Sequence, residues 1–411
     1  MQPSERNGTA VSEARRALLQ KYLRGAKPAT IPKREGSGPA VLSYPQRQIW
    51  LHSQLAADWL IYNEPITIYR YGTLDVSALE RAFTEIVRRH EAWRTTFRWD
   101  DTECVQIVRP APKRVEIPIV DLRTHPRPEA EALRLATADM HQPFDLPKGP
   151  MYRLRLARLR DDEHRLYITL HHIIFDGVSL YRVLLSDLVT AYEAFSKNEP
   201  PRLPDIPIQY SDYAVWQRKT IKEIPSEHLS YWKSTLADLP VLNLKTDRPR
   251  PPSQTYSGAI ELFEISSETS AALKLLSREQ RAAPFAVMAA AFTALLHGYT
   301  GQDDIVIGGI SSGRDRAETM NLLGCFLNTL PIRCGFSETD RFVDLIARIR
   351  GTILEALSHE TPFELLVQKF ARKRDPSRAP LLQILMVMEP PLDPLPPGWG
   401  FSYMDVKADT A

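Results

Sequence analysis

The stretch Leu166-Tyr-Ile-Thr-Leu-His-His-Ile-Ile-Phe-Asp-Gly177 decides the fold of this chain, because it joins a strand to a helix. Leu166, Ile168 and Leu170 alternate with more polar neighbours, which predicts a half-buried strand. After Gly177 the apolar residues recur at helical spacing, at Tyr181, Leu184, Leu185, Leu188 and Tyr192. Two histidines, an aspartate and a glycine are therefore expected where a strand gives way to an amphipathic helix.

Consecutive histidines on a strand point to opposite faces, so we expect His171 and His172 to have different roles. A histidine near its ordinary pKa of about 6.5 exchanges protons at neutral pH. Asp176 could fix an imidazole or pair with an arginine, and Gly177 permits a tight turn. A lone histidine on an apolar strand is usually a core residue, but the whole pattern favours a catalytic site.

Composition narrows the class of protein. The 411 residues are 43% apolar and 25% charged, which is typical of a globular protein large enough for two cores. The net charge of +2 gives no indication of nucleic-acid binding. Three scattered cysteines favour a reducing compartment, and neither a signal peptide nor a long apolar run is apparent. We therefore expect a soluble, cytoplasmic protein without membrane association. A metal site is not expected, since no His-Glu-x-x-His occurs.

The pattern His171-His-x-x-x-Asp-Gly177 resembles the signature of condensation domains of nonribosomal peptide synthetases, in the chloramphenicol-acetyltransferase-like superfamily. All seven motifs of that family have counterparts in order between residues 42 and 382. Besides the histidine motif, the segments are 42–51, 89–97, 210–216, 324–333, 359–364 and 374–381. Trp93 replaces the family's usual Leu, Ala379 its Asn and Val178 a common Trp.

The resemblance implies an α/β fold of two chloramphenicol-acetyltransferase-like lobes in a V-shaped pseudodimer. The N-terminal lobe would cover residues 38–225, and the C-terminal lobe 226–411, truncated at its end. The proline-rich connection 247–252 marks the change in character between them. Residues 1–37 contain a short basic amphipathic helix at 12–23 and a linker, which is either a frayed terminus or a docking element.

The resemblance also assigns roles within the motifs. His172 would orient or deprotonate an attacking amine, whereas His171 would be satisfied in the core. Asp176 would pair with an arginine of segment 89–97, either Arg94 or Arg89, and Gly177 would offer its N–H to an oxyanion. Candidates for the lining of the substrate tunnel are Ser179, Asn328 and Thr329, with Ser179 also a helix cap rather than a nucleophile.

The implied reaction joins a donor acyl or peptidyl thioester to the amine of an acceptor aminoacyl thioester. Both substrates would arrive on the 4'-phosphopantetheine arms of carrier proteins, with no cofactor bound by the chain itself. Further expected partners are an adjacent adenylation domain or an upstream polyketide synthase module, and the chain is expected to be a monomer.

The histidine at 171, where heterocyclising relatives carry aspartate, and the pair Asn328-Thr329 are similar to condensing members. The run 173–179 resembles members that accept L-amino acids in hybrid polyketide–peptide systems. One alternative is a free-standing acyltransferase that uses coenzyme A thioesters. Gly398-Trp-Gly400, in a proline-rich loop, matches the plant-type motif of such enzymes only poorly. The other is an inactive recruitment domain, against which the intact His172, Asp176 and Gly177 argue.

Overall fold

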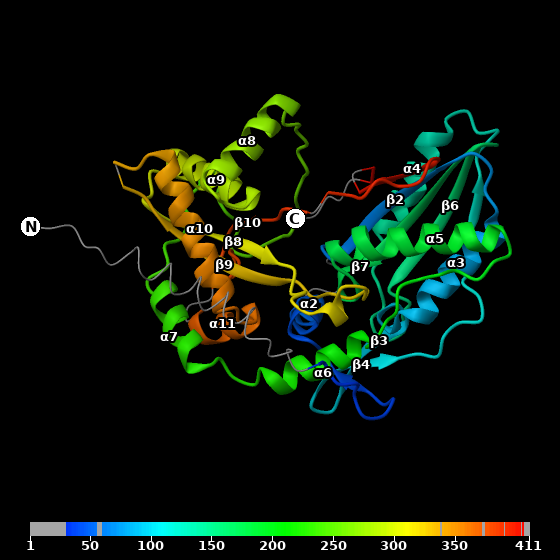
Figure 1. Cartoon of the computed structure of the whole chain (residues 1–411), viewed down its shortest axis with the longest axis horizontal. Helices are drawn as coiled ribbons and strands as arrows, with labels where there is room; N and C mark the ends of the chain where they lie inside the picture. The colour runs from blue at the N-terminus through cyan, green and yellow to red at the C-terminus, as the bar shows by residue number, and fades with distance from the viewer. Residues whose placement is uncertain are drawn as a thin grey trace, which may run out of the picture.

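The computed structural model describes residues 30–55, 60–337, 339–371, 375–389, 391–403 and 405–406. The predicted helix over 12–23 lies outside these residues. Figure 1 shows two halves side by side, one built on β2, β6 and β7, the other on β8, β9 and β10. Between them lie α2 and the chain ahead of β9.

The larger sheet carries the histidine motif. Its order is β11-β2-β7-β6-β5, with β2 spanning Asn63–Tyr71, β5 Ile119–Asp121, β6 Tyr152–Arg160, β7 Glu163–His171 and β11 Trp399–Ser402. Strand β2 runs antiparallel to β7, which places Asn63 opposite His171.

Strand β7 is covered on both faces, so the prediction of a half-buried strand was wrong. Leu166, Ile168 and Leu170 pack toward α3 (Val76–Arg89) and α5 (Leu185–Ser196). On the other face, Tyr167 packs against α4 (Pro128–Met140). A strand with helices on both sides has no solvent face, and its polar side chains must then find partners inside.

The pattern Ser77-Ala-Leu-Glu80 predicts a capping box with Ser77 as the N-cap of a helix, but the N-cap of α3 lies two residues earlier. Asp75 is the N-cap, and its carboxylate accepts a hydrogen bond from the Ala78 N–H at 3.0 Å. The box predicted at Ser77 and Glu80 was therefore wrong. The Glu80 carboxylate instead accepts from the Ile117 N–H at 3.0 Å and pairs with Arg114.

From His172 onward the chain forms two irregular helical segments before the regular helix α5 begins. A 3₁₀ turn, η2, spans His172–Ile174, a π-helical segment, η3, spans Ser179–Leu184, and α5 follows. The predicted apolar stripe is confirmed, since Leu184, Leu185, Leu188 and Tyr192 are buried. π-Helical turns are frequent at functional sites because they displace side chains from regular helical positions.

A small sheet and two helices lie beneath the motif. The sheet is β1 (Ala40–Val41), β4 (Glu103–Val108) and β3 (Thr95–Asp100), and the helices are α2 (Tyr44–Leu55) and α6 (Tyr210–Thr220). The short 3₁₀ turn η1 spans Glu91–Arg94. The aromatic residues of segment 210–216 predict a role in packing. Helix α6 confirms it, because Tyr210 is buried against Tyr213 and Phe326.

The second half has its own sheet, in the order β10-β8-β9. The strands are β8 (Asp304–Ser311), β9 (Asn328–Gly335) and β10 (Leu385–Met386), and η4 spans Ala317–Thr319. The helices are α7 (Ser226–Thr235), α8 (Ser267–Glu279), α9 (Pro284–Thr300), α10 (Phe342–Ser358) and α11 (Phe363–Phe370). The alanine-rich stretch 284–297 predicts a helix and the apolar run 304–308 a strand, and α9 and β8 confirm both. Alanines of α9 lie in this half's core.

Two segments cross between the halves. Leu322, Leu323, Cys325 and Phe326 belong to the core of the first half. Residues 399–402, which the sequence analysis assigned to the C-terminal lobe, form β11 and pair with β2, Trp399 opposite Arg70 (Figure 1). The proline-rich loop expected around Gly400 is thus partly a strand. The division at residue 225 stays a prediction, and β11 departs from it.

Among the described residues no single helix is long and apolar enough to cross a membrane. Only α8 and α9 taken together, bent by 108° at their junction, meet the length and composition test.

Candidate active site

His171 ends β7 and is enclosed by protein. Its Nδ1 accepts a hydrogen bond from the Ile173 N–H at 3.3 Å, and its ring packs against Tyr62 and Phe144. Burial lowers the pKa of His171 to about 3, with smaller contributions from the charges of His172 and Arg153. The imidazole is therefore neutral and held in place, which agrees with the structural role expected for it.

His172 lies half-buried in the turn that follows. Its backbone N–H donates to the Tyr62 carbonyl at 2.8 Å, and its ring stacks on Phe175 with centroids 4.7 Å apart. Burial lowers the pKa of His172, partly offset by the carbonyl oxygens of His172 and Phe175 and by Asp176. The lowered pKa keeps the imidazole neutral at pH 7, so one ring nitrogen carries a proton and the other a lone pair.

Cys325 brings the second half of the molecule to this imidazole. Its Sγ lies 3.9 Å from Nδ1 of His172. Burial raises the pKa of the Cys325 thiol, so it remains an uncharged S–H and is a poor nucleophile. The contact shows that the histidine faces the segment around 322–326, which crosses from the second half into the core of the first.

Asp176 is held by a buried arginine from the second half. Its side chain has no exposed surface, and Arg314 donates through one nitrogen to both carboxylate oxygens, at 3.0 and 3.2 Å. The N–H groups of Ser179 and Phe326 also donate to it, at 2.7 and 2.9 Å. The carboxylate thus caps the following helix and ties it to the second half.

The expected partners of Asp176 were wrong. Arg89 donates to the Pro204 carbonyl, and Arg94 to the Arg109 carbonyl and, at 3.4 Å, to Glu91. The real partner, Arg314, follows β8 in the Ser-Gly-Arg loop at 312–314. Nothing in the local pattern distinguishes this arginine, because its position depends on how the loop folds back between the halves.

Ser179 is fully buried, which leaves it no surface toward a tunnel, and the residue that caps the helix is Asp176 rather than Ser179. Its hydroxyl oxygen lies 2.8 Å from the Gly324 carbonyl and accepts from the Gly324 N–H at 3.1 Å. Arg314 donates to the same hydroxyl at 2.6 Å. Gly324 is needed here because a β-carbon would overlap the ring of Tyr210. Ser179 therefore joins the helix start to the crossing segment.

The other tunnel candidates lie at the start of β9. The Asn328 amide donates to Glu360 and to the Thr361 carbonyl, each at 3.0 Å, and accepts from the Phe363 N–H at 2.9 Å. These bonds hold the connection between α10 and α11, a structural task. Thr329 is half-buried opposite Ile310 on β8. A role for either residue in lining the tunnel stays a prediction.

Gly177 faces a residue that the sequence analysis missed. A β-carbon at Gly177 would lie 2.6 Å from Oε1 of Glu389, a residue just beyond β10. A second missed carboxylate, Glu64, stands next to Asn63 at the start of β2. No sequence signal joins these positions, because they come from three separate parts of the chain.

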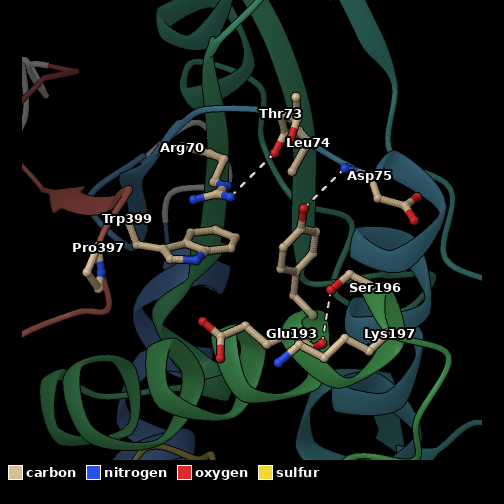
Figure 2. Close-up of a pocket in the computed structure, with 10 residues that line it drawn as sticks. Arg70, Thr73, Leu74, Asp75, Glu193, Ser196, Lys197, Pro397 and Trp399 are labelled. Carbon is tan, nitrogen blue, oxygen red and sulfur yellow. Dashed lines mark hydrogen bonds between the residues drawn. The ribbon is translucent and has the colours of Figure 1, made fainter.

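A separate pocket of about 560 Å³ lies where β11 meets β2 (Figure 2). Its wall includes Arg70, whose guanidinium carbon is 5.2 Å from the Trp399 ring centroid and which donates to the Thr73 carbonyl at 3.4 Å. Arg70 is seven residues along β2 from Asn63, about 23 Å at the rise of a strand. The pocket is therefore formed where β11 packs beside β2, and it lies far from His172.

Across the described ranges, no three His, Cys, Asp or Glu side chains converge as ligands for a metal ion. The histidine turn, held between two α/β halves by the Arg314–Asp176 pair, instead places the chain among proteins with the chloramphenicol-acetyltransferase-like fold. A family model described as "Condensation domain" matches residues 37–404. The chain belongs to this family of amide-bond-forming acyltransferases.

The relatives that this chain matches are much longer than the chain itself. It is 42% identical over 355 residues to one of the linear gramicidin synthase proteins of Brevibacillus parabrevis, covering 85% of the chain and 4% of the relative. It is 38% identical over 393 residues to phosphinothricin tripeptide synthetase PhsC of Streptomyces viridochromogenes, covering 92% of the chain and 36% of the relative. The chain thus spans only a part of each.

Solved structures share the fold. The first condensation domain of the CDA synthetase has a TM-score of 0.72 at 22% identity, covering 89% of this chain and 87% of that one. SgcC5 of Streptomyces globisporus has a TM-score of 0.68 at 27% identity, covering 80% of this chain and 75% of that one.

Proposed function

We propose that this chain joins a donor acyl or peptidyl thioester to the amine of an acceptor aminoacyl thioester. Each substrate would be carried on the 4'-phosphopantetheine arm of a carrier protein. The observation that carries the proposal is the neutral His172 imidazole beside the segment that crosses between the two halves. The names of the relatives, which are synthases and synthetases of peptides, support the same reaction.

In the proposed step the acceptor nitrogen attacks the donor thioester carbonyl. The C–N bond forms, the C–S bond breaks, and the donor thiolate leaves with a proton as a thiol. His172 orients the amine or takes its proton. An α-amine of pKa about 8 is already partly neutral at pH 7, so orientation alone is a sufficient role for the imidazole.

The finer assignment is an enzyme that accepts L-amino acids in a hybrid polyketide–peptide system. His171 in place of an aspartate and the pair Asn328-Thr329 support a condensing rather than a heterocyclising or epimerising member. We further propose a monomer of two lobes, 38–225 and 226–411, with an adjacent adenylation domain or an upstream polyketide synthase module as neighbours. Residues 1–37 are proposed as a docking element.

The test is amide formation between two loaded carrier proteins, followed by mass spectrometry, for wild type, His172→Ala and the exposed control His125→Ala. Product from wild type and control, with loss of roughly 10²–10⁴-fold in His172→Ala, supports proton transfer by His172. Equal turnover by all three refutes its role. Turnover of small coenzyme A thioesters would instead support a free-standing acyltransferase, and carrier binding without any product would support a recruitment domain.

A further inference from the structure

Gly177 lies directly against a carboxylate from the chain between β10 and β11. Oε1 and Cδ of Glu389 lie 2.6 and 2.7 Å from the place where a β-carbon of Gly177 would stand. Glu389 is exposed, so its carboxylate can be reached from solvent. Within the part of the chain that the structure describes, it has no cation within ion-pairing distance. The absence of a side chain at residue 177 is what admits this carboxylate.

A second carboxylate, Glu64, lies near enough to Glu389 for their charges to interact. Glu64 is paired in register with Leu170, so its side chain shares the face of the sheet that Leu170 presents toward η3 and α5. Burial raises the pKa of Glu64 to about 7, and the charge of Glu389 adds to the effect. Burial also raises the pKa of Glu389, with a contribution from Asp176.

Tyr181 connects the two carboxylates to the helix that begins at the motif. Burial raises the pKa of its phenol, and the charges of Glu389, Tyr403 and Glu64 raise it further. Its ring meets Phe401 of β11 edge-on, with centroids 5.7 Å apart. The groups near Gly177 are therefore anionic or neutral. The nearby cation Arg314 is already bound by Asp176 and Ser179.

The sign of this charge decides which reacting group fits beside Gly177. A developing oxyanion would be repelled by Glu389, so the expected donation from the Gly177 N–H to an oxyanion is disfavoured. A cation would be attracted, and it would lower the raised pKa values of both carboxylates. In the proposed reaction, on which this inference rests, the only cation among the reacting groups is the acceptor ammonium.

We infer that Glu389 and Glu64 form the subsite for the acceptor ammonium and take up the first proton that it loses. The ammonium carries three protons, and the product amide keeps one. One proton passes to a carboxylate before attack and then to water. The other leaves the attacking nitrogen through His172 and ends on the departing donor thiolate. Atoms and charge balance without a further reactant.

A structural alternative exists for Glu389. A helix begins at Gly177, and an anion near a helix N-terminus is stabilising. If that were its whole role, removal of the charge would lower the melting temperature and leave recognition of the amine unchanged. If Glu389 belongs to the ammonium subsite, removal of its charge should instead weaken recognition of the amine.

The test measures binding without turnover, so it is independent of whether the chain forms amides. The probes are an aminoacyl pantetheine in which an amide replaces the thioester, and the same molecule without its α-amine. Isothermal titration gives the affinity ratio of the two probes for wild type, Glu389→Gln and Glu64→Gln. Glu193→Gln, which removes an exposed carboxylate on α5 beside the far pocket, is the matched control.

The expected result is a wild-type preference for the amine-bearing probe of about tenfold or more, since a charge-assisted hydrogen bond is lost without it. Each active-site variant should lose most of this preference, and the control should keep it. An unchanged ratio in Glu389→Gln overturns the inference. The companion assay of amide formation by wild type separates that outcome from a failure of the proposed function.

A double-mutant cycle gives an independent check. Gly177→Ala forces the Glu389 carboxylate away, so it should reduce the amine preference in wild type and have little further effect in Glu389→Ala. Additive losses in the double variant would show that the two positions act separately, against the inference.

Discussion

Replacing Arg314 by methionine should be among the most destabilising single changes in the protein. The side chains of Arg314 and Asp176 are 1% and 0% exposed, and the guanidinium also donates to the Leu322 carbonyl at 3.0 Å and to the Thr319 carbonyl. Methionine keeps the length of the side chain but leaves a buried carboxylate without its counter-charge. Breaking a buried ion pair in this way costs about 3–5 kcal/mol.

Urea denaturation followed by circular dichroism measures this effect. The midpoint should fall for Arg314→Met while the slope stays near the wild-type value, because the surface exposed on unfolding is similar. In Arg314→Met with Asp176→Asn, the loss should be smaller than the sum of the single losses. The exposed pair Arg341–Asp344 provides the control, and Arg341→Gln should scarcely move the midpoint. A loss below about 1 kcal/mol for Arg314→Met would refute the reasoning.

Three further outcomes are expected. Because burial lowers the pKa of His172, the acid limb of kcat/KM should lie below about pH 6.5, and a limb above this value would contradict a neutral imidazole. The folded pKa of Glu64, about 7, exceeds its ordinary 4.5, so its contribution to stability is present below pH 4.5 and is lost as the pH rises to 7, by about 3 kcal/mol. Glu64→Gln should therefore gain stability relative to wild type between pH 5 and 8 in urea titrations, and equal pH profiles would count against this. Gly324→Ala should lower the free energy of unfolding by about 1–3 kcal/mol, because a β-carbon overlaps Tyr210; a neutral change would show that the ring can move.

Local signals in the sequence were sufficient for the elements that carry the site. The alternation before His171 and the helical spacing after Gly177 are properties of neighbouring residues, and a strand and a helix form there, although β7 is covered on both faces and a π-helical segment precedes α5. The order of the motifs was sufficient for the family, and the comparisons confirm it. The aromatic content of α6 likewise indicated packing, since large rings must be buried wherever the helix lies.

Some predictions failed because their outcome depends on what packs against an element from elsewhere in the chain. Strand β7 has α4 on its second face, which alternation within the strand cannot reveal. The start of α3 depended on which of two nearby polar residues was free to cap it. Asp75 caps the helix, whereas a box at Ser77 cannot close because its second member, Glu80, is occupied by Arg114 and the Ile117 N–H.

The sequence by itself determined the strand–helix joint and the family. The tertiary structure alone decided that Arg314, rather than Arg94 or Arg89, pairs with Asp176, and that Glu389 lies against Gly177. The physical reason is the distance along the chain between the residues that interact. Periodicity and capping arise between residues a few positions apart, whereas the partner of a buried charge is chosen by the path of a distant loop.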